Sequence, residues 1–418
     1  MSFTFTFAFA DAHPGSTQPP HGGPTPPLAR QAAGPGRSGR RAWRLPPMAW
    51  LACGAAAAAP GAMAAPSLND TGQVTCLVGS VVSGSCAGTG QDADDGRDVD
   101  HPKRLDGWYG FRYAKVCNSG ERAGQGQCPA DPPLGPGPDD WACTKDLVSG
   151  LLWEVKTNDG GPRDQHRRYT NTGTGRAGDA GALVRGVNAA GLCGRQDWRL
   201  PERIELIGLQ NFGVKGGEVK IDSVWFPNSW EAEGGAEFWS GTRYAGRKTA
   251  AWAVSFQIGG THALRGETLP VRLTSGSKPW VGPGRWQASG DQVLDQATGL
   301  IWRRCAEGQQ WSGSTCTGTP MALGWSQAVQ WAQDAAAGGT PWRLPNVKEL
   351  SSLVDDTRIR PALDPAAFPG APVVAEAYWS STGLHPNEMA WAVSFWGGRV
   401  DPVYTGVSYS SRLVRNAP

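Results

Sequence analysis

The chain contains an internal duplication, in which the same short sequence blocks occur twice and in the same order. WRLP begins at Trp198 and again at Trp342, and AWAVSF begins at Ala251 and again at Ala390. Such self-similarity at a long period limits the possible folds, because it indicates two copies of one structural unit. The other matched blocks are DLVSGLLW (146–153) and DQATGLIW (295–302), IDSVWFP (221–227) and LDPAAFP (363–369), FWSGT (238–242) and YWSST (378–382), and Arg272-Leu273 and Arg412-Leu413.

The blocks define two domains and leave an N-terminal segment and a linker outside them. With 418 residues the chain is long enough for two or three domains. We place the first copy at 143–276 and the second copy at 291–418, joined by a linker at 277–290. Residues 65–142 form a Cys-containing segment that belongs to neither copy.

Residues 1–64 have the composition of a leader. Arginines precede an apolar, Ala-rich stretch that runs from Met48 to Ala65, and a small-residue cleavage motif ends at Ala64. These are the parts of a secretory signal, whereas Pro60 and the short length argue against a membrane span. We therefore predict export to the periplasm, the cell surface or the medium, with no stable membrane span after signal removal. Lipidated and free forms both stay open, as does the true translation start.

The cysteine count agrees with export. The chain has nine cysteines. Cleavage after Ala64 removes Cys53 and leaves an even number of cysteines. An even number of cysteines in an oxidising compartment indicates disulfides. The sequence has no C-x-x-C pair, which argues against a zinc site. Several connectivities stay open, and loop length favours the pairs Cys76–Cys86, Cys117–Cys128, Cys143–Cys193 and Cys305–Cys316.

Each copy reads as two helices followed by antiparallel strands. Apolar residues at helical spacing predict a first helix before WRLP, and the proline of WRLP is expected in the first turn of a second helix. FWSGT and AWAVSF alternate with the period of strands. We therefore predict an α+β fold with a mainly antiparallel sheet. The residues that carry this prediction are Leu183, Val187, Ala190 and Pro201 in the first copy, and Trp325, Ala328, Val329, Ala332 and Pro345 in the second.

The ordered set GL-x-W, WRLP, FWS-x-T and AWAVSF resembles the Lcl C-terminal domain family over both copies. That family is named for a collagen-like surface protein and often occurs as repeats in exported bacterial proteins. The resemblance implies two tandem C-type lectin-like modules with a binding or adhesion role. The calcium-ligand motifs of sugar-binding lectins are missing, so calcium-dependent sugar binding is not carried over. We predict no cofactor and no metal.

The sequence contains no constellation that predicts catalysis. No histidine of the exported part recurs between the copies, and the nucleophile elbow and the phosphate-binding loops are absent. We therefore predict that the protein is not an enzyme. One catalytic alternative stays open, since the C-type lectin-like fold is related to that of formylglycine-generating enzymes, which use cysteine and copper.

Residues that both copies share are interpreted as structural, because they maintain a common fold. The arginine of WRLP adjoins a glutamate at the start of the same helix, so we expect these two to pair. A ligand site built on the same pairs is the alternative. The structural residues are Trp198, Arg199, Glu205 and Trp252 in the first copy, and Trp342, Arg343, Glu349 and Trp391 in the second.

Ligand contacts are expected where the copies differ, in loops over a rigid scaffold. The first copy is net positive, and its basic loops suit the sulfate or carboxylate groups of a polyanionic glycan. Aromatic residues near the end of the second copy suit a sugar or a protein partner. Solvated charge and core packing are the alternatives. The candidates are Arg163, Arg167, Arg168, Arg243, Arg247, Lys248, Trp396, Tyr404 and Tyr409.

The expected partner is therefore a glycan or an envelope or surface protein. The formal net charge is only +2, and most of the basic excess lies in the leader, so no nucleic-acid footprint is present. A structural subunit of an envelope assembly is the alternative function. The sequence leaves the oligomeric state open.

Overall fold

The computed structural model describes most of the chain after the leader. No helix within the described ranges is long and apolar enough to cross a membrane. The predicted leader at 1–64, with its secretory signal, lies outside these ranges. The structure describes residues 68–79, 81–96, 103–104, 106–214, 218–229, 237–279, 282–372, 377–385 and 388–418.

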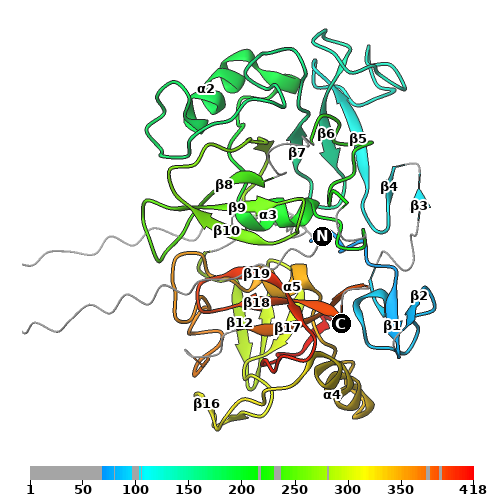
Figure 1. Cartoon of the computed structure of the whole chain (residues 1–418), viewed down its shortest axis with the longest axis vertical. Helices are drawn as coiled ribbons and strands as arrows, with labels where there is room; N and C mark the ends of the chain where they lie inside the picture. Colours follow the sequence, from blue (N-terminus) through cyan, green and yellow to red (C-terminus); the bar gives the residue numbers. More distant parts are fainter. Residues whose placement is uncertain are drawn as a thin grey trace, which may run out of the picture. The chain divides into compact units, whose positions relative to one another are not determined.

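The first copy, cyan to green in Figure 1, contains two antiparallel sheets and two helices. One sheet has the strand order β11-β7-β6-β5, and the other has the order β10-β9-β8. The elements are β5 (Tyr113–Cys117), β6 (Trp141–Asp146), β7 (Leu152–Glu154), α2 (Ala180–Ala190), α3 (Arg203–Leu209), β8 (Glu237–Arg243), β9 (Ala251–Ser255), β10 (Thr261–Leu264) and β11 (Thr274–Ser275).

The second copy, yellow to red in Figure 1, repeats this arrangement. Its sheets have the orders β12-β13-β14-β20 and β17-β18-β19, and a small hairpin of β15 and β16 is added. The elements are β12 (Trp286–Ser289), β13 (Gln292–Asp295), β14 (Leu300–Arg303), β15 (Gln310–Trp311), β16 (Cys316–Thr317), α4 (Trp325–Ala337), α5 (Val347–Ser352), β17 (Tyr378–Leu384), β18 (Met389–Ser394), β19 (Arg399–Tyr404) and β20 (Val414–Asn416). The duplication in the sequence is thus a duplication of structure.

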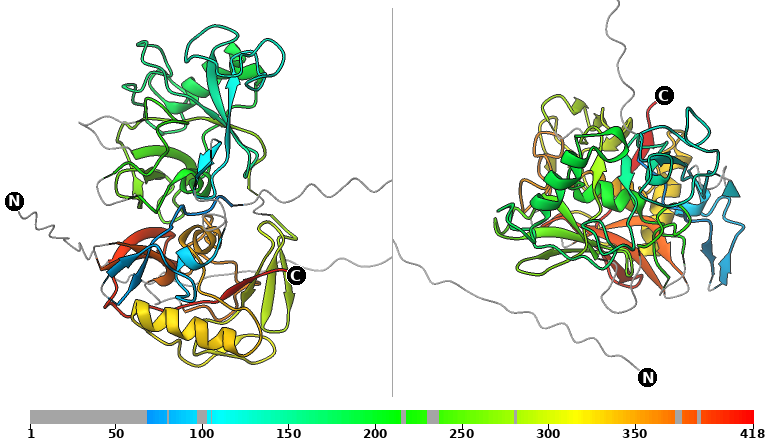
Figure 2. Two further views of the ribbon diagram at one scale, coloured as in Figure 1. Left: turned by 90° about the vertical axis from the view of Figure 1, so that its right-hand side faces the viewer. Right: turned by 90° about the horizontal axis from the view of Figure 1, so that it is seen from above.

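The N-terminal segment forms short elements, of which those within residues 76–94 lie beside the second copy (Figures 1 and 2). The side-chain amide of Gln333 on α4 donates to the carbonyl oxygen of Gly88 at 2.7 Å. The hydroxyl of Thr382 on β17 donates to a carboxylate oxygen of Asp92 at 2.6 Å. The elements are β1 (Cys76–Val78), β2 (Val81–Ser83), the 3₁₀ helix η1 (Asp92–Asp94), β3 (Lys103–Arg104) and β4 (Gly107–Trp108).

The predicted helices are present, with two corrections. All four predicted core residues of α4 are buried, but Ala190 at the end of α2 is exposed. Pro201 and Pro345 lie one residue before the N-caps of α3 and α5, and not in the first turn. The reason is that each proline carbonyl accepts a hydrogen bond from the strand after it in the sequence, from Gly241 N at 2.7 Å and from Ser381 N at 2.8 Å.

Each four-stranded sheet begins one strand earlier than the matched blocks suggest. β5 lies in the segment that we assigned to neither copy, yet it pairs with β6. β12 lies in the predicted linker 277–290, yet it pairs with β13. Both are outer strands, whose sequences differ between the copies and therefore give no repeat signal.

The four predicted disulfides are confirmed. Cys143–Cys193 ties β6 to the turn after α2, and it closes the longest loop, with a sequence separation of 50. The three short loops are closed by Cys76–Cys86, Cys117–Cys128 and Cys305–Cys316.

The strands of AWAVSF separate two cores. In β9, Ala251 and Ala253 face a core that contains Leu183 and Val187 of α2. Val254 faces the opposite way, into a core that contains residues of both copies. The two copies therefore share this central core, while each also has a second core of its own.

The contacts between the copies are reciprocal. Gly259 and Gly398 occupy equivalent places, since each N–H donates to the carbonyl of the serine in AWAVSF, at 2.8 Å and 2.7 Å. A β-carbon on Gly259 would lie 2.5 Å from the Trp391 ring, and one on Gly398 would lie 3.6 Å from the Trp252 ring. Each copy thus places its glycine turn against the tryptophan of the other, which is the pattern of a two-fold related pair.

The same symmetry holds along the outer strands. Thr261 pairs with the valine of AWAVSF in the first copy, and Val400 pairs with the same valine in the second. These two equivalent residues meet, because the Val400 N–H donates to the Thr261 hydroxyl at 3.0 Å. The duplicated modules therefore pack like a symmetric dimer within one chain.

Candidate ligand site

A tight turn between β8 and β9 presents the basic residues of the first copy. Tyr244 N donates to the carbonyl of Ala250 at 3.1 Å, and Arg247 N donates to the carbonyl of Tyr244 at 3.0 Å. These bonds fold residues 244–250 into a compact loop in which Arg247 and Lys248 are exposed. The loop thus holds two cations close to the ends of β9 and β10.

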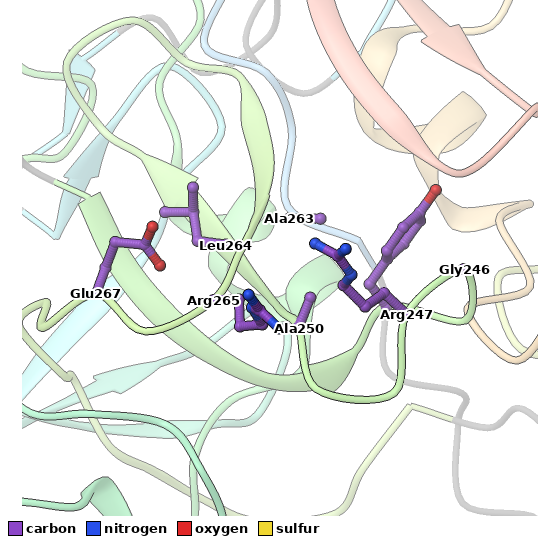
Figure 3. A pocket seen from close by; sticks show the side chains of 8 residues that line it. Gly246, Arg247, Ala250, Ala263, Leu264, Arg265 and Glu267 are labelled. Carbon is purple, nitrogen blue, oxygen red and sulfur yellow. The ribbon is translucent and has the colours of Figure 1, made fainter. Parts of the chain in front are cut away.

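A depression of about 470 Å³ lies beside this loop. Figure 3 shows Arg247 and Arg265 on either side of Ala250, with Glu267 beyond Leu264. One wall is aromatic, since the Tyr244 ring packs edge-on against the Trp252 ring, with centroids 5.3 Å apart. The full lining is Tyr244, Gly246, Arg247, Ala250, Ala263, Leu264, Arg265 and Glu267.

The charges of this depression are open to a ligand. Arg247, Arg265 and Glu267 are all exposed. No described carboxylate forms an ion pair with either guanidinium, so both keep their donors available. Two fork-shaped guanidinium groups and one carboxylate give a site that favours anions with planar or tetrahedral oxygen groups.

Most of the other predicted basic residues are engaged elsewhere. Arg243 donates to the backbone carbonyl of Asn171 at 2.6 Å. Arg163 and Arg167 donate to backbone carbonyls within or beside their own loop, at 3.4 Å and 2.8 Å. Of the six predicted cations, only Arg247 lines the depression. Those outside its lining are Arg163, Arg167, Arg168, Arg243 and Lys248.

The three predicted aromatic residues of the second copy do not form one surface. Trp396 is 42% exposed and carries the Arg360 guanidinium 4.5 Å from its ring centroid. Tyr404 is 66% exposed at the far end of β19. Tyr409 packs on the Trp379 ring at 5.1 Å, so it contributes to the core.

The shared arginines and glutamates form the same bidentate pair in both copies. Arg199 donates to both carboxylate oxygens of Glu205 at 2.7 Å, and Arg343 does the same to Glu349 at 2.7 Å. Each glutamate also accepts the N-cap N–H of its helix, at 2.6 Å in α3 and 2.9 Å in α5. Burial lowers the pKa of Arg343, but the charge and hydrogen bonds of Glu349 raise it by more, so the pKa of Arg343 lies above its usual value. The predicted structural tryptophans Trp198, Trp252, Trp342 and Trp391 are all buried.

Sequence reasoning missed the functional side chains of the depression other than Arg247, namely Tyr244, Arg265 and Glu267. Arg265 follows β10, and Tyr244 opens the turn after β8. Both stand outside the matched blocks. A signal was present in the basic run that follows FWSGT, but only the pairing of β9 with β10 brings Arg265 beside it. Among the described residues, no group of three or more His, Cys, Asp or Glu side chains could hold a metal ion.

The fold and the site define a class of protein, a tandem-repeat α+β protein stabilised by disulfides. The sequence model of the Lcl C-terminal domain family matches residues 142–273 and 291–415, which is more than half of the chain. The chain therefore belongs to the Lcl C-terminal domain family, with two copies of the domain, as predicted. No curated protein matches the chain.

Proposed function

We propose that this is an exported, non-catalytic binding or adhesion protein with C-type lectin-like modules, and that its first copy binds a polyanionic glycan. The observation that carries the proposal is the open pair of guanidinium groups, Arg247 and Arg265, in a depression with an aromatic wall. Sulfate and carboxylate groups match the guanidinium fork, and the Tyr244 ring offers an apolar face to a sugar.

Export and a non-catalytic role draw support from the cysteines. All eight cysteines in the described part of the chain are bonded in pairs. Disulfides persist in oxidising compartments, which favours export. A formylglycine-generating type of chemistry would need free thiols, and paired cysteines do not supply them.

Retention on immobilised heparin tests the proposal. The protein should be retained at low salt and released as sodium chloride rises, because salt screens contacts between exposed charges, with a Debye length of about 10 Å at 0.1 M. Arg247→Ser with Arg265→Ser should elute at clearly lower salt than the wild type. Arg176→Ser is the matched control, since Arg176 is exposed in the same copy but lies outside the depression.

A change of opposite sign sharpens this test. Glu267 is the one carboxylate of the depression, so Glu267→Gln should raise the salt needed for elution. If the arginine variants and Glu267→Gln all elute with the wild type, heparin does not bind in this depression and the proposal is wrong.

A structural or assembly role is the second candidate, favoured by exposed tryptophans of the second copy. Trp396 is 42% exposed and Trp331 is 39% exposed. Large exposed indoles are typical of protein contacts. Self-association that Trp396→Ser abolishes, without any change in heparin retention, would favour this role.

A further inference from the structure

The depression of the first copy borders the second copy through the side chain of Tyr244. A β-carbon on Gly397 of the second copy would lie 3.1 Å from the Tyr244 hydroxyl oxygen, so the tyrosine lies directly against this glycine. A β-carbon on Gly246, in the loop of Tyr244 itself, would lie 2.6 Å from the same ring. Neither glycine covers the ring with a side chain, and Tyr244 is only half-buried. The aromatic wall of the depression therefore reaches the edge of the second copy.

An exposed pair of an indole and a guanidinium continues the surface at this edge. Trp396 directly precedes Gly397 and is 42% exposed, and the Arg360 guanidinium lies 4.5 Å from its ring centroid. The Arg360 backbone N–H donates to the Trp396 carbonyl at 3.0 Å, which holds the two residues side by side. Arg360 is exposed, and within the described ranges its guanidinium forms no ion pair. Its donors are thus open to an anion.

The two-fold relation of the copies creates a second junction, at which every one of these positions has a counterpart. Strand pairing and the matched blocks fix the equivalences, and the Lys220 and Ala362 N–H groups donate to the phenylalanine carbonyls of AWAVSF at 2.7 Å and 2.6 Å. The counterparts are Leu384 for Tyr244, Ile258 for Gly397, Gln257 for Trp396, Glu218 for Arg360 and Tyr404 for Arg265.

The comparison shows that the scaffold does not require the cations. At the second junction, a carboxylate replaces the Arg360 guanidinium and a phenol replaces the Arg265 guanidinium. Ile258 supplies a side chain, 50% exposed, at the position where Gly397 leaves the Tyr244 ring uncovered. Packing between the copies would favour similar residues at both junctions. Open guanidinium groups and half-exposed rings gather at one junction only, which indicates a ligand surface there.

We propose that Arg265, Arg247, Tyr244, Trp396 and Arg360, together called the junction strip, bind one polyanionic chain that crosses from the first copy to the second. This inference rests on the proposed function and specifies its ligand as an extended chain of sugars rather than a single sugar or a free anion. Guanidinium groups at both ends suit anionic groups that recur along a chain, and the rings between them suit the apolar faces of its sugars.

Isothermal titration calorimetry of the full chain with two heparin fragments tests the proposal. A disaccharide can occupy only the depression, whereas an octasaccharide can follow the strip. Trp396→Gln with Arg360→Glu gives these positions the side chains of their counterparts, which the same scaffold already accepts. This variant should bind the octasaccharide about tenfold or more weakly, because a charge-assisted contact is replaced by repulsion. Its affinity for the disaccharide should change less than about twofold, because salt screens charges outside the depression.

A matched control separates a local contact from a general effect of charge. Arg176→Glu with Trp331→Gln makes the same two kinds of substitution at exposed positions outside the strip. This control variant should bind both fragments within about twofold of the wild type. If the strip variant does not fold, Arg360→Ser alone should still weaken octasaccharide binding. It should also reduce the salt dependence of that binding, because one fewer cation displaces the counterions of the chain.

The outcomes distinguish this inference from the proposed function on which it rests. If the strip variant and the control variant bind the octasaccharide equally, the junction strip is wrong. A loss of affinity in Arg247→Ser with Arg265→Ser would then leave the proposed function intact. No binding of either fragment to the wild type at millimolar concentration would overturn both. Equally tight binding of a polyglutamate peptide with the charge of the octasaccharide would assign the strip to an acidic protein segment and overturn the glycan chain.

Discussion

The buried ion pair between Arg203 and Asp356 provides a direct test of how the copies pack. Arg203 belongs to the first copy and is fully buried, and its Nε donates to Asp356 Oδ1 of the second copy at 3.0 Å. A second bond of 3.4 Å joins Nη2 to Oδ2. The guanidinium also lies 5.3 Å from the centroid of the Trp252 ring. Asp356→Ala would leave this charge buried without its anion.

The expected cost follows from this geometry. Removing one partner of a buried pair costs about 3–5 kcal/mol. The Asp356 side chain keeps 24% exposure, and the contact of Arg203 with Trp252 persists, so we expect about 3 kcal/mol. Arg203→Met with Asp356→Ala removes both charges and should lie within about 1 kcal/mol of the wild type. Asp356→Ala should therefore be less stable than the double variant by about 2 kcal/mol.

Equilibrium unfolding in urea, followed by tryptophan fluorescence, measures these values. Asp401→Ala is the matched control, because Asp401 pairs with Arg399, whose side chain is 53% exposed, and loss of a surface pair costs only about 0–1 kcal/mol. A loss below about 0.5 kcal/mol for Asp356→Ala, or additive effects in the double variant, would refute a desolvated pair between the copies.

Three more variants test other parts of the structure. In the wild type, burial raises the pKa of Asp92 from 3.8 to about 7, so the folded state holds this proton more tightly than the unfolded state does. The free energy of unfolding should therefore fall as pH rises from about 4 to about 7. Asp92→Asn should remove that slope in urea titrations. Lys220→Met should raise the free energy of unfolding by about 1–2 kcal/mol at pH 7, because the Lys220 ammonium is buried with no described acceptor and burial lowers its pKa to about 8. That gain should shrink toward pH 10 in thermal denaturation, and an unchanged stability at pH 7 would show that the amine is solvated. Replacing Cys143 and Cys193 with serine opens a loop with a separation of 50 residues and should cost about 4 kcal/mol by loop entropy, measured under non-reducing conditions.

Local sequence signals predicted the repeated part of the fold. The helical spacing of Trp325, Ala328, Val329 and Ala332 gives the buried face of α4, and the alternation of AWAVSF gives β9 and β18. The three disulfides with sequence separations of 10 or 11 follow from short spacing, since nearby cysteines rarely have better partners. Each of these features depends on residues close in the sequence.

Long-range contacts account for what the sequence could not predict. Strand β5 joins the first sheet without any resemblance to β12, and Asp92 contacts Thr382 across a sequence separation of 290. In the candidate site, the basic turn gave Arg247, whereas Arg265 became its neighbour only through the pairing of β9 with β10. No local pattern encodes such partners.

The reciprocal interface explains why the copies resemble each other where they do. Gly259 and Gly398 have φ values of 90° and 95°, a conformation that side chains rarely adopt, and each glycine approaches the tryptophan of the other copy. The AWAVSF residues, together with Gly259 and Gly398, are therefore required by contact with the partner copy as well as by the fold of each copy. Ligand sites are free of that constraint. The depression with Arg247 is lined by residues outside the matched blocks, so its side chains can differ between the copies without disturbing the shared scaffold.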